Sequence, residues 1–316
     1  MKLLILTQKI DKNDPILGFF HRWLEEFSKC FEKVTVICLE RGESTLPTNV
    51  RVFSLGKEGG KSRVRYILRF YQYIWQERKN YDAVFIHMNQ EYVLLGWKFW
   101  KLWGKTIYLW RNHAKGNFLT RLAVLFSDKV FYTSPKSYTA QFKKAVQMPV
   151  GIDTEFFKPD QSVSRIPKSI LFLGRIAPVK RVLEFIDWLK GRNFDLVTIA
   201  GSALPKDKDY ENEVRIKVEK SDFRNKVKFI GTVTQEEARK LYQTHETYVN
   251  FTPSGSMDKT ILEATTCETS IIVMNENLKY ILENKKGPEL RDFVVKNHSL
   301  KVLMNQLINQ LCLHQK

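Results

Sequence analysis

Hydrophobic positions follow two different periods along this chain, and the two periods alternate. Short continuous apolar runs, typical of buried strands, are separated by longer segments whose apolar residues share one face of a helix. In the first half, the predicted strands are Lys2–Thr7, Val34–Leu39, Val50–Ser54, Ala83–His87, Thr106–Trp110 and Lys129–Thr133. The predicted helices are Gly18–Phe31, Val64–Trp75, Val93–Trp103 and Phe118–Phe126. Strands that alternate with helices indicate βαβ units and a parallel sheet covered on both faces.

The alternation stops at a proline-punctuated segment, Pro159 to Pro167, and then begins again. Predicted strands follow at Ser169–Leu173, Asp195–Ala200, Val227–Ile230, Thr247–Phe251 and Ser270–Met274. Predicted helices follow at Pro178–Lys190, Asp209–Lys220, Gln235–Gln243, Asp258–Cys267, Leu278–Glu283 and Leu300–Leu313. A chain of 316 residues exceeds the length at which one core keeps growing, so we expect two domains, residues 1–160 and residues 161–316. The predicted fold class is α/β, with two Rossmann-like parallel-sheet domains facing an interdomain cleft.

The composition of the chain mainly excludes classes of protein and of site. Apolar residues make up 43% of the chain, which argues against disorder. The 4 cysteines form no CxxC pair, so neither a zinc site nor a disulfide framework is indicated. The N-terminal apolar run is too short for a signal peptide, and no run approaches the ~20 apolar residues that span a bilayer. We therefore expect a cytoplasmic protein, or one that is peripheral on the inner face of the membrane.

The positive charge of the chain is unevenly distributed. The net charge is +17, and residues 57–121 alone carry 13 basic against 4 acidic side chains. Nucleic acid, an anionic lipid surface and a phosphorylated substrate are all candidate partners for such a field. In the segment Val93–Trp103, Lys98 and Lys101 are surrounded by tryptophan and phenylalanine, a pattern that suits the interface of an anionic bilayer. Packing of the same helices on a sheet is the alternative, and no nucleic-acid motif accompanies the charge.

The segment Thr252–Val273 has the pattern of an anion site, and an ordinary βαβ unit with a solvated Glu and Lys is the alternative. A strand is followed by a turn of small and polar residues and then by a helix start, which together present backbone N–H groups and a positive dipole end. Lys259 places a cation where the dipole already favours an anion. Glu263 lies one helical turn beyond the position of the anion. The candidate binding residues of this segment are Ser256, Asp258, Lys259, Thr260 and Glu263.

A second candidate site follows the strand Ser169–Leu173. Gly174 lets the backbone approach a ligand, and Arg175 and Lys180 stand at the start of the next predicted helix, with Pro178 as its first residue. Two cations over a helix N-terminus form a clamp for a diphosphate, Arg as a fork and Lys as a point charge.

These segments, in this order, resemble glycosyltransferase family 4, a large retaining family with the GT-B fold. The resemblance covers most of the chain and is carried by Gly151–Phe157 (GIDTEFF), Phe172–Lys180 (FLGRIAPVK), Lys228–Val233 (KFIGTV) and Thr252–Ala264 (TPSGSMDKTILEA). It implies that the two cations of the clamp neutralise the diphosphate of a UDP-sugar or GDP-sugar. It also implies that Glu263 holds the ribose hydroxyls and that the backbone at Val233 reads the base. His113 is similar to the family's histidine beside the donor sugar, and Gly18 to the glycine of its N-terminal loop.

One position departs from the family pattern. The first glutamate of the family's E-x7-E pair falls at Gly255, which leaves the sugar contacts open. The function we expect is retaining hexosyl transfer from a nucleotide-sugar to an envelope polysaccharide, glycolipid or lipid-linked acceptor. No DxD-like pair adjoins the clamp, so we expect neither a metal nor another cofactor. The alternatives are a nucleotide-sugar binding protein without transferase activity and, from charge alone, a nucleic-acid-binding α/β protein.

Overall fold

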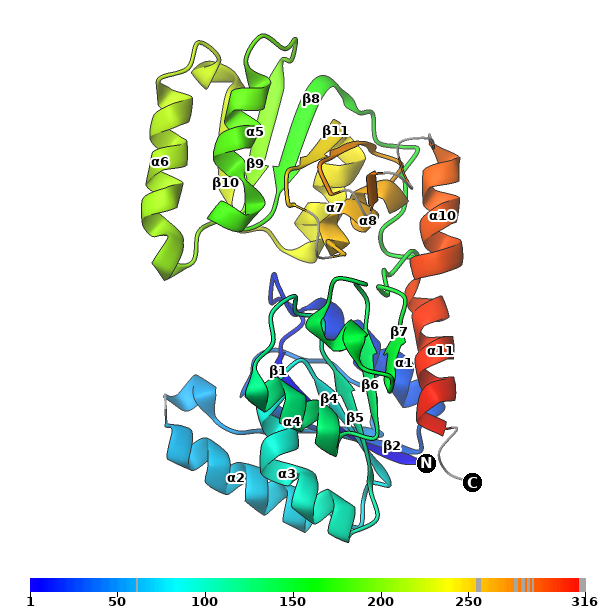
Figure 1. The fold of residues 1–316 in the computed structure, drawn as a ribbon. Coiled ribbons are helices and arrows are strands. Elements are labelled where there is room, and N and C mark those ends of the chain that lie inside the picture. Colours follow the sequence, from blue (N-terminus) through cyan, green and yellow to red (C-terminus); the bar gives the residue numbers. More distant parts are fainter. Residues whose placement is uncertain are drawn as a thin grey trace. The chain divides into compact units, whose positions relative to one another are not determined.

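The chain forms two compact units in the computed structural model, which describes residues 1–60, 62–253, 257–275, 278–279, 282, 285 and 287–312 (Figure 1). The first unit comprises Met1–Pro149 together with the C-terminal residues from Leu303, and the second comprises Val150–Val302. Of the predicted helix Leu278–Glu283, residues 280, 281 and 283 lie outside the described residues.

A parallel sheet forms the centre of the first unit. Its strands are arranged in the order β3-β2-β1-β4-β5-β6-β7, and every neighbouring pair is parallel. The strands are β1 (Lys2–Ile10), β2 (Lys33–Arg41), β3 (Val50–Ser54), β4 (Ala83–His87), β5 (Thr106–Trp110), β6 (Lys129–Tyr132) and β7 (Ala145–Gln147). The short strand β7 is missing from the sequence prediction because its three residues are too few to show a period.

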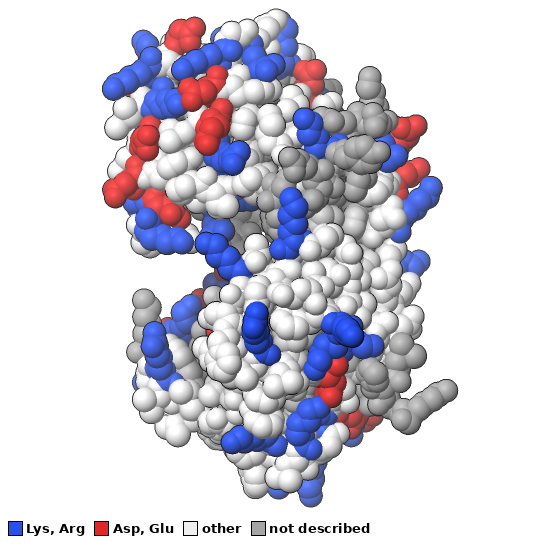
Figure 2. Space-filling view, viewed as in Figure 1, with Lys and Arg blue, Asp and Glu red and all other residues white. Residues whose placement is uncertain are grey.

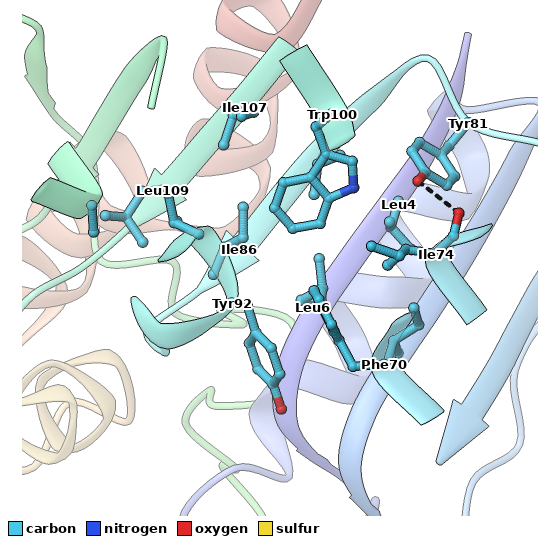
Figure 3. Packing of buried hydrophobic residues seen from close by; sticks show 14 of the residues in the cluster. Leu4, Leu6, Phe70, Ile74, Tyr81, Ile86, Tyr92, Trp100, Ile107 and Leu109 are labelled. Carbon is cyan, nitrogen blue, oxygen red and sulfur yellow. Dashed lines mark hydrogen bonds between the residues drawn. The ribbon is translucent and has the colours of Figure 1, made fainter. Parts of the chain in front are cut away.

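Helices cover both faces of this sheet. One face carries α2 (Arg63–Gln76), α3 (Glu91–Leu102) and α4 (Phe118–Phe126), whose buried side chains share one hydrophobic cluster with the strands. Figure 3 shows Trp100 and Phe70 of these helices facing the strand residue Leu6. The other face carries α1 (Phe19–Cys30), where Trp23 meets Trp110 with ring centroids 5.0 Å apart. Because successive strand residues point to opposite faces, apolar runs such as β5 serve both layers at once.

The second unit repeats this design with a smaller sheet. Its strand order is β10-β9-β8-β11-β12, again with parallel neighbours. The strands are β8 (Ile166–Leu173), β9 (Leu196–Ala200), β10 (Val227–Gly231), β11 (His245–Asn250) and β12 (Ser270–Val273). The helices α5 (Val182–Leu189) and α6 (Lys208–Glu219) share a core with one face, and α7 (Gln235–Thr244), α8 (Lys259–Thr266) and α10 (Pro288–His298) share a core with the other. Two parallel sheets, each covered on both faces, confirm the predicted α/β class.

The division of the chain differs from the expected one at residues 160 and 161. The boundary lies at Pro149 and Val150, and the end of α11 (Leu300–Cys312) belongs to the first unit. Its attachment there is specific: the Tyr108 hydroxyl donates to the carbonyl of Leu311 at 3.0 Å, and the Lys129 ammonium donates to the Gln310 side chain. The sequence could not predict that the C-terminal helix packs on the first sheet. The apolar pattern of α11 shows that one face of the helix is buried, but not which unit buries it.

The predicted helix Pro178–Lys190 is interrupted. Pro178–Lys180 form a single 3-10 turn, Arg181 adopts a left-handed backbone with φ 51°, and α5 begins only at Val182. The prediction that Pro178 begins the helix is therefore wrong. The left-handed residue ends the turn and redirects the chain, so Lys180 precedes α5 instead of standing in its first turn.

Apolar side chains remain exposed on the helices of residues 57–121. Val64 and Leu68 of α2 are 69% and 65% exposed, and Leu102 of α3 is 81% exposed. Over this part of the first unit, Figure 2 shows basic side chains separated by broad uncharged areas. A search of the described helices finds none with the length and apolarity that crossing a membrane requires.

Candidate functional site in the second unit

The carboxyl ends of β8 and β11 lie side by side in the middle of the second sheet. The order of successive strands reverses between these two, from β8-β9-β10 on one side to β11-β12 on the other. In open α/β sheets such a switch point leaves a crevice beyond the strand ends, where ligands bind. The residues that the sequence marks as a diphosphate clamp follow β8, and those that it marks as an anion site follow β11.

Main chain packs against main chain at this edge, because β8, β9 and β10 each lead into or end at a glycine. The Gly174 amide donates to the Ala200 carbonyl at 2.9 Å, and the Gly201 amide donates to the Gly231 carbonyl at 2.6 Å. A Cβ atom on Gly201 would lie 1.9 Å from the Gly174 carbonyl oxygen, so no other residue fits. Gly174 therefore packs against the loop that follows β9, and its lack of a side chain leaves the backbone bare there.

Arg175 and Lys180, which follow β8, differ in the burial and in the hydrogen bonding of their side chains. Arg175 is exposed, and its guanidinium makes no ion pair or hydrogen bond with any residue that the structure describes. Lys180 is mostly buried, and its ammonium donates to the carboxylate of Asp258, 78 residues further along the chain. This contact joins the segment after β8 to the residue that caps α8, so the two candidate sites predicted separately lie at one place.

The Asp258 carboxylate is held by several donors besides Lys180. Asn250 donates to its Oδ2 atom at 3.1 Å, as does the Thr252 hydroxyl, and the Thr260 hydroxyl donates to Oδ1 at 2.9 Å. Burial alone would raise the pKa of Asp258. The charge of Lys180 and these hydrogen bonds outweigh burial and lower the pKa to about 2. Asp258 is therefore ionised at neutral pH, and its position is fixed from both strand ends.

A second layer of buried polar groups supports this network. The Tyr248 hydroxyl donates to Thr260 at 2.7 Å and accepts from the Asn250 amide at 2.9 Å. Tyr248 and Asn250, at the carboxyl end of β11, are missing from the predicted site residues, and Thr252 is predicted only as the first residue of the anion-site segment. The signal available was Asn250 itself, a polar residue that is fully buried at a strand terminus and must find partners there.

Glu263 lies one turn further along α8 and is linked to the same network. It accepts a hydrogen bond from the buried hydroxyl of Tyr242 at 3.3 Å, and the Tyr242 ring meets the Tyr248 ring at 5.6 Å. Lys259, four residues before Glu263, has a buried side-chain nitrogen. Burial lowers the pKa of the Lys259 ammonium, and the charge of Glu263 opposes that shift. Lys259 thus points into the unit, whereas the sequence places it against the helix dipole to meet a ligand.

The structure gives less detail for two other predicted ligand contacts, those of Val233 and Ser256. Val233 follows β10 and packs partly buried against the cluster that includes α7 and α8, so its backbone is at the same end of the sheet. Ser256 and Gly255 lie outside the described residues.

Gly18 and His113 belong to the first unit. Gly18 precedes α1 and donates to the Asp14 carbonyl at 2.9 Å; a Cβ there would lie 2.5 Å from the same oxygen. Position 18 therefore requires glycine because the loop before α1 passes close to it. His113 follows β5 and is exposed, and its Nδ1 atom accepts from the Lys115 amide at 3.0 Å. Across the described part of both units, no group of three or more His, Cys, Asp or Glu side chains is arranged to hold a metal ion.

The family model described as glycosyl transferases group 1 matches residues 153–311. Among curated proteins, no sequence matches this chain. Solved structures similar to it include sucrose-phosphate synthase from Thermosynechococcus elongatus, at 14% identity and TM-score 0.72, covering 98% of this chain and 99% of that chain.

Anabaena HepE in complex with UDP is also similar, at 15% identity and TM-score 0.68, covering 98% of this chain and 95% of that chain. HepE has further been solved with UDP-glucose, with 14% identity, TM-score 0.68 and the same coverage of both chains. At these identities the likeness defines the fold alone, and that fold is GT-B, as the sequence predicted.

Proposed function

This chain belongs to the glycosyl transferases of group 1, and on that premise we propose that it moves a hexosyl group from a nucleoside diphosphate to a hydroxyl of an envelope polysaccharide, glycolipid or lipid-linked acceptor. The observation that carries the proposal is the contact between Lys180 and Asp258 at the switch point of the second sheet. The contact joins the segment after β8, which also carries the exposed Arg175, to the start of α8, and it supports the proposal because open α/β sheets bind anionic ligands beyond such strand ends.

The difficult step of this reaction is the departure of the diphosphate. As the bond between the anomeric carbon and the phosphate oxygen breaks, negative charge accumulates on the leaving group. Arg175 and Lys180 are placed to offset that charge, and each such contact is worth about 2–4 kcal/mol of barrier. The acceptor oxygen forms the new bond to the anomeric carbon, and its proton passes to the departing phosphate. We propose front-face attack with retention of configuration, and charge stabilisation by these two side chains without a metal ion.

The resemblance supplies two further roles in the proposal: Glu263 accepts hydrogen bonds from the ribose hydroxyls, and the backbone at Val233 contacts the base. Asp258 orients the Lys180 ammonium, as their hydrogen bond supports. HepE is bound to UDP and UDP-glucose in its solved structures, which supports UDP-sugars as the first donors to test, before GDP-sugars. The resemblance also implies roles in donor binding for Gly18 and His113, which belong to the first unit, and we include both in the proposal.

The excess of basic residues in residues 57–121, together with exposed Val64, Leu68 and Leu102, supports a membrane-bound acceptor. We place the protein at the inner face of the membrane as a peripheral enzyme.

The test is a donor panel with a lipid extract as acceptor. Release of nucleoside diphosphate that depends on the extract, with an α-configured product from an α-configured donor, is the expected result. Tight donor binding without release across the panel would instead favour a binding protein. Release that EDTA abolishes would contradict the metal-independent mechanism.

A further inference from the structure

An apolar pocket opens between the C-terminal halves of α2 and α3, on the outer side of the first unit. Its volume is about 370 Å³, within the range of roughly 300–1,000 Å³ found for ligand pockets. It is lined by Tyr71, Gln72, Ile74, Trp75, Gln76, Phe99 and Trp103. The centroids of Trp75 and Trp103 are 5.7 Å apart and those of Tyr71 and Phe99 5.6 Å, so mutual ring contacts shape the walls.

The pocket rests on the hydrophobic core and does not belong to the sugar-nucleotide site. Ile74 lines the pocket and is also part of the cluster of α2, α3 and the first sheet, where its carbonyl accepts from Tyr81 (Figure 3). The Tyr71 hydroxyl donates to the Leu95 carbonyl at 3.2 Å and ties the two helices together. The walls are therefore held by the fold and do not collapse freely when the pocket is empty.

A cation contacts one of the residues that line the pocket. The Arg78 guanidinium lies 4.6 Å from the centroid of the Trp75 ring and donates to the Trp75 carbonyl at 2.7 Å. Trp75 is itself 53% exposed. The same helix presents Val64, Leu68, Tyr71 and Trp75 at helical spacing along one side, and Leu102 of α3 projects beside Trp103.

The apolar pocket, the nearby cation and the exposed apolar side chains together fit one kind of ligand. An apolar slot accepts a hydrocarbon chain, and a guanidinium stacked on a lining residue can pair with an anionic head group. The exposed leucines around it suit the interfacial region of a bilayer, whereas a free soluble ligand would leave them in water. We propose that this pocket takes the acyl chain of an anionic phospholipid, with Arg78 as counter-ion of its phosphate. The inference rests on the proposed membrane contact but not on sugar transfer.

The test uses tryptophan fluorescence of the full chain with phosphatidylcholine vesicles, with or without phosphatidylglycerol carrying brominated acyl chains. Bromine quenches only tryptophans that its chain reaches. We expect quenching with brominated phosphatidylglycerol, and loss of most of it when Trp75→Phe and Trp103→Phe are combined. The matched variant Trp188→Phe, a partly buried tryptophan of the second unit, keeps the quenching.

The charge is tested by Arg78→Gln against Arg192→Gln. Arg192 also stacks on a tryptophan, at 4.0 Å from Trp188, and also donates to that residue's carbonyl, but in the second unit. We expect a several-fold weaker affinity for anionic vesicles with Arg78→Gln, no change with Arg192→Gln, and unchanged donor-induced thermal stabilisation in both.

Either of two results would overturn the proposed lipid site. One is quenching in the double tryptophan variant equal to that in the wild-type chain, and the other is a vesicle affinity that Arg78→Gln does not change. Dimerisation without lipid that Leu102→Asp abolishes, combined with no vesicle binding, would assign the surface to a second copy of the chain and also reject the proposal. Failure of donor binding in the wild-type chain would instead count against the transferase and leave the vesicle result standing.

Discussion

Lys180 and Asp258 meet across the carboxyl edge of the second sheet, the lysine ammonium donating to the carboxylate from a segment 78 residues away along the chain. Both side chains are mostly buried, at 16% and 10% exposure. A charge pair of this kind is held in place by its surroundings more than by its own attraction, because desolvation offsets much of the Coulomb energy. The pair therefore sets the position of the lysine, and a bound diphosphate would share that cation with the aspartate.

The first prediction concerns this lysine in catalysis. Lys180→Ala should lower kcat for donor turnover by about a hundredfold to a thousandfold, because one counter-charge of the leaving group is lost. Steady-state release of nucleoside diphosphate measures the effect. Lys226→Ala is the matched control, since Lys226 precedes β10 at the opposite edge of the same sheet and donates to the Phe194 carbonyl. Equal losses in the two variants would refute a local role for Lys180.

The second prediction concerns stability against pH. The pKa of Asp258 is about 2 in the folded chain and ordinarily about 3.9 when exposed. A depressed carboxyl pKa stabilises the fold above the unfolded value, and the contribution disappears as pH falls through the folded value. Asp258→Asn should lower the free energy of unfolding at neutral pH by about 2 kcal/mol. Denaturant titrations should find that this difference shrinks between about pH 4 and pH 2; a constant difference would rule the mechanism out.

The third prediction isolates the close approach of two glycine loops. Gly201 and Gly191 both have positive φ, 132° and 70°, but an added Cβ meets the Gly174 carbonyl only at Gly201 and has open space at Gly191. Gly201→Ala should therefore cost more stability than Gly191→Ala, by about 1–3 kcal/mol. Thermal unfolding of the two variants gives the comparison. Similar losses would mean that backbone conformation, and not the clash, decides both.

The fourth prediction concerns donor affinity. Glu263→Gln should weaken donor binding about tenfold, or ~1.4 kcal/mol, because an amide accepts ribose hydroxyls less well than a carboxylate does. Isothermal titration with the donor that stabilises the protein best measures the change. Glu213→Gln, an exposed glutamate on α6, is expected to bind the donor normally. If the Glu263→Gln variant binds the donor with unaltered affinity, the proposed contact between Glu263 and the ribose is wrong.

Much of the site was accessible from local patterns. Arg175 and Lys180 stand in the segment after a strand, and Glu263 lies one turn into the helix that follows another strand. Such boundaries between elements can be recognised from neighbouring residues. The break at Arg181 escaped prediction because a single left-handed residue leaves no mark in a hydrophobic period. The inward direction of Lys259 also escaped, since the length of its side chain allows either course and only the packing around Glu263 selects one.

The sequence by itself determined the alternation of strands and helices, the two sheets and the residues that gather at strand ends, because these depend on periodicity and on short-range turn chemistry. Only the tertiary structure decided that Asp258 holds Lys180, that Asn250 and Tyr248 support this pair, and that the C-terminal helix ends on the first sheet beside Tyr108. Such contacts join residues far apart in the chain, and which partners a buried polar group finds depends on strand order and packing, which no local pattern encodes.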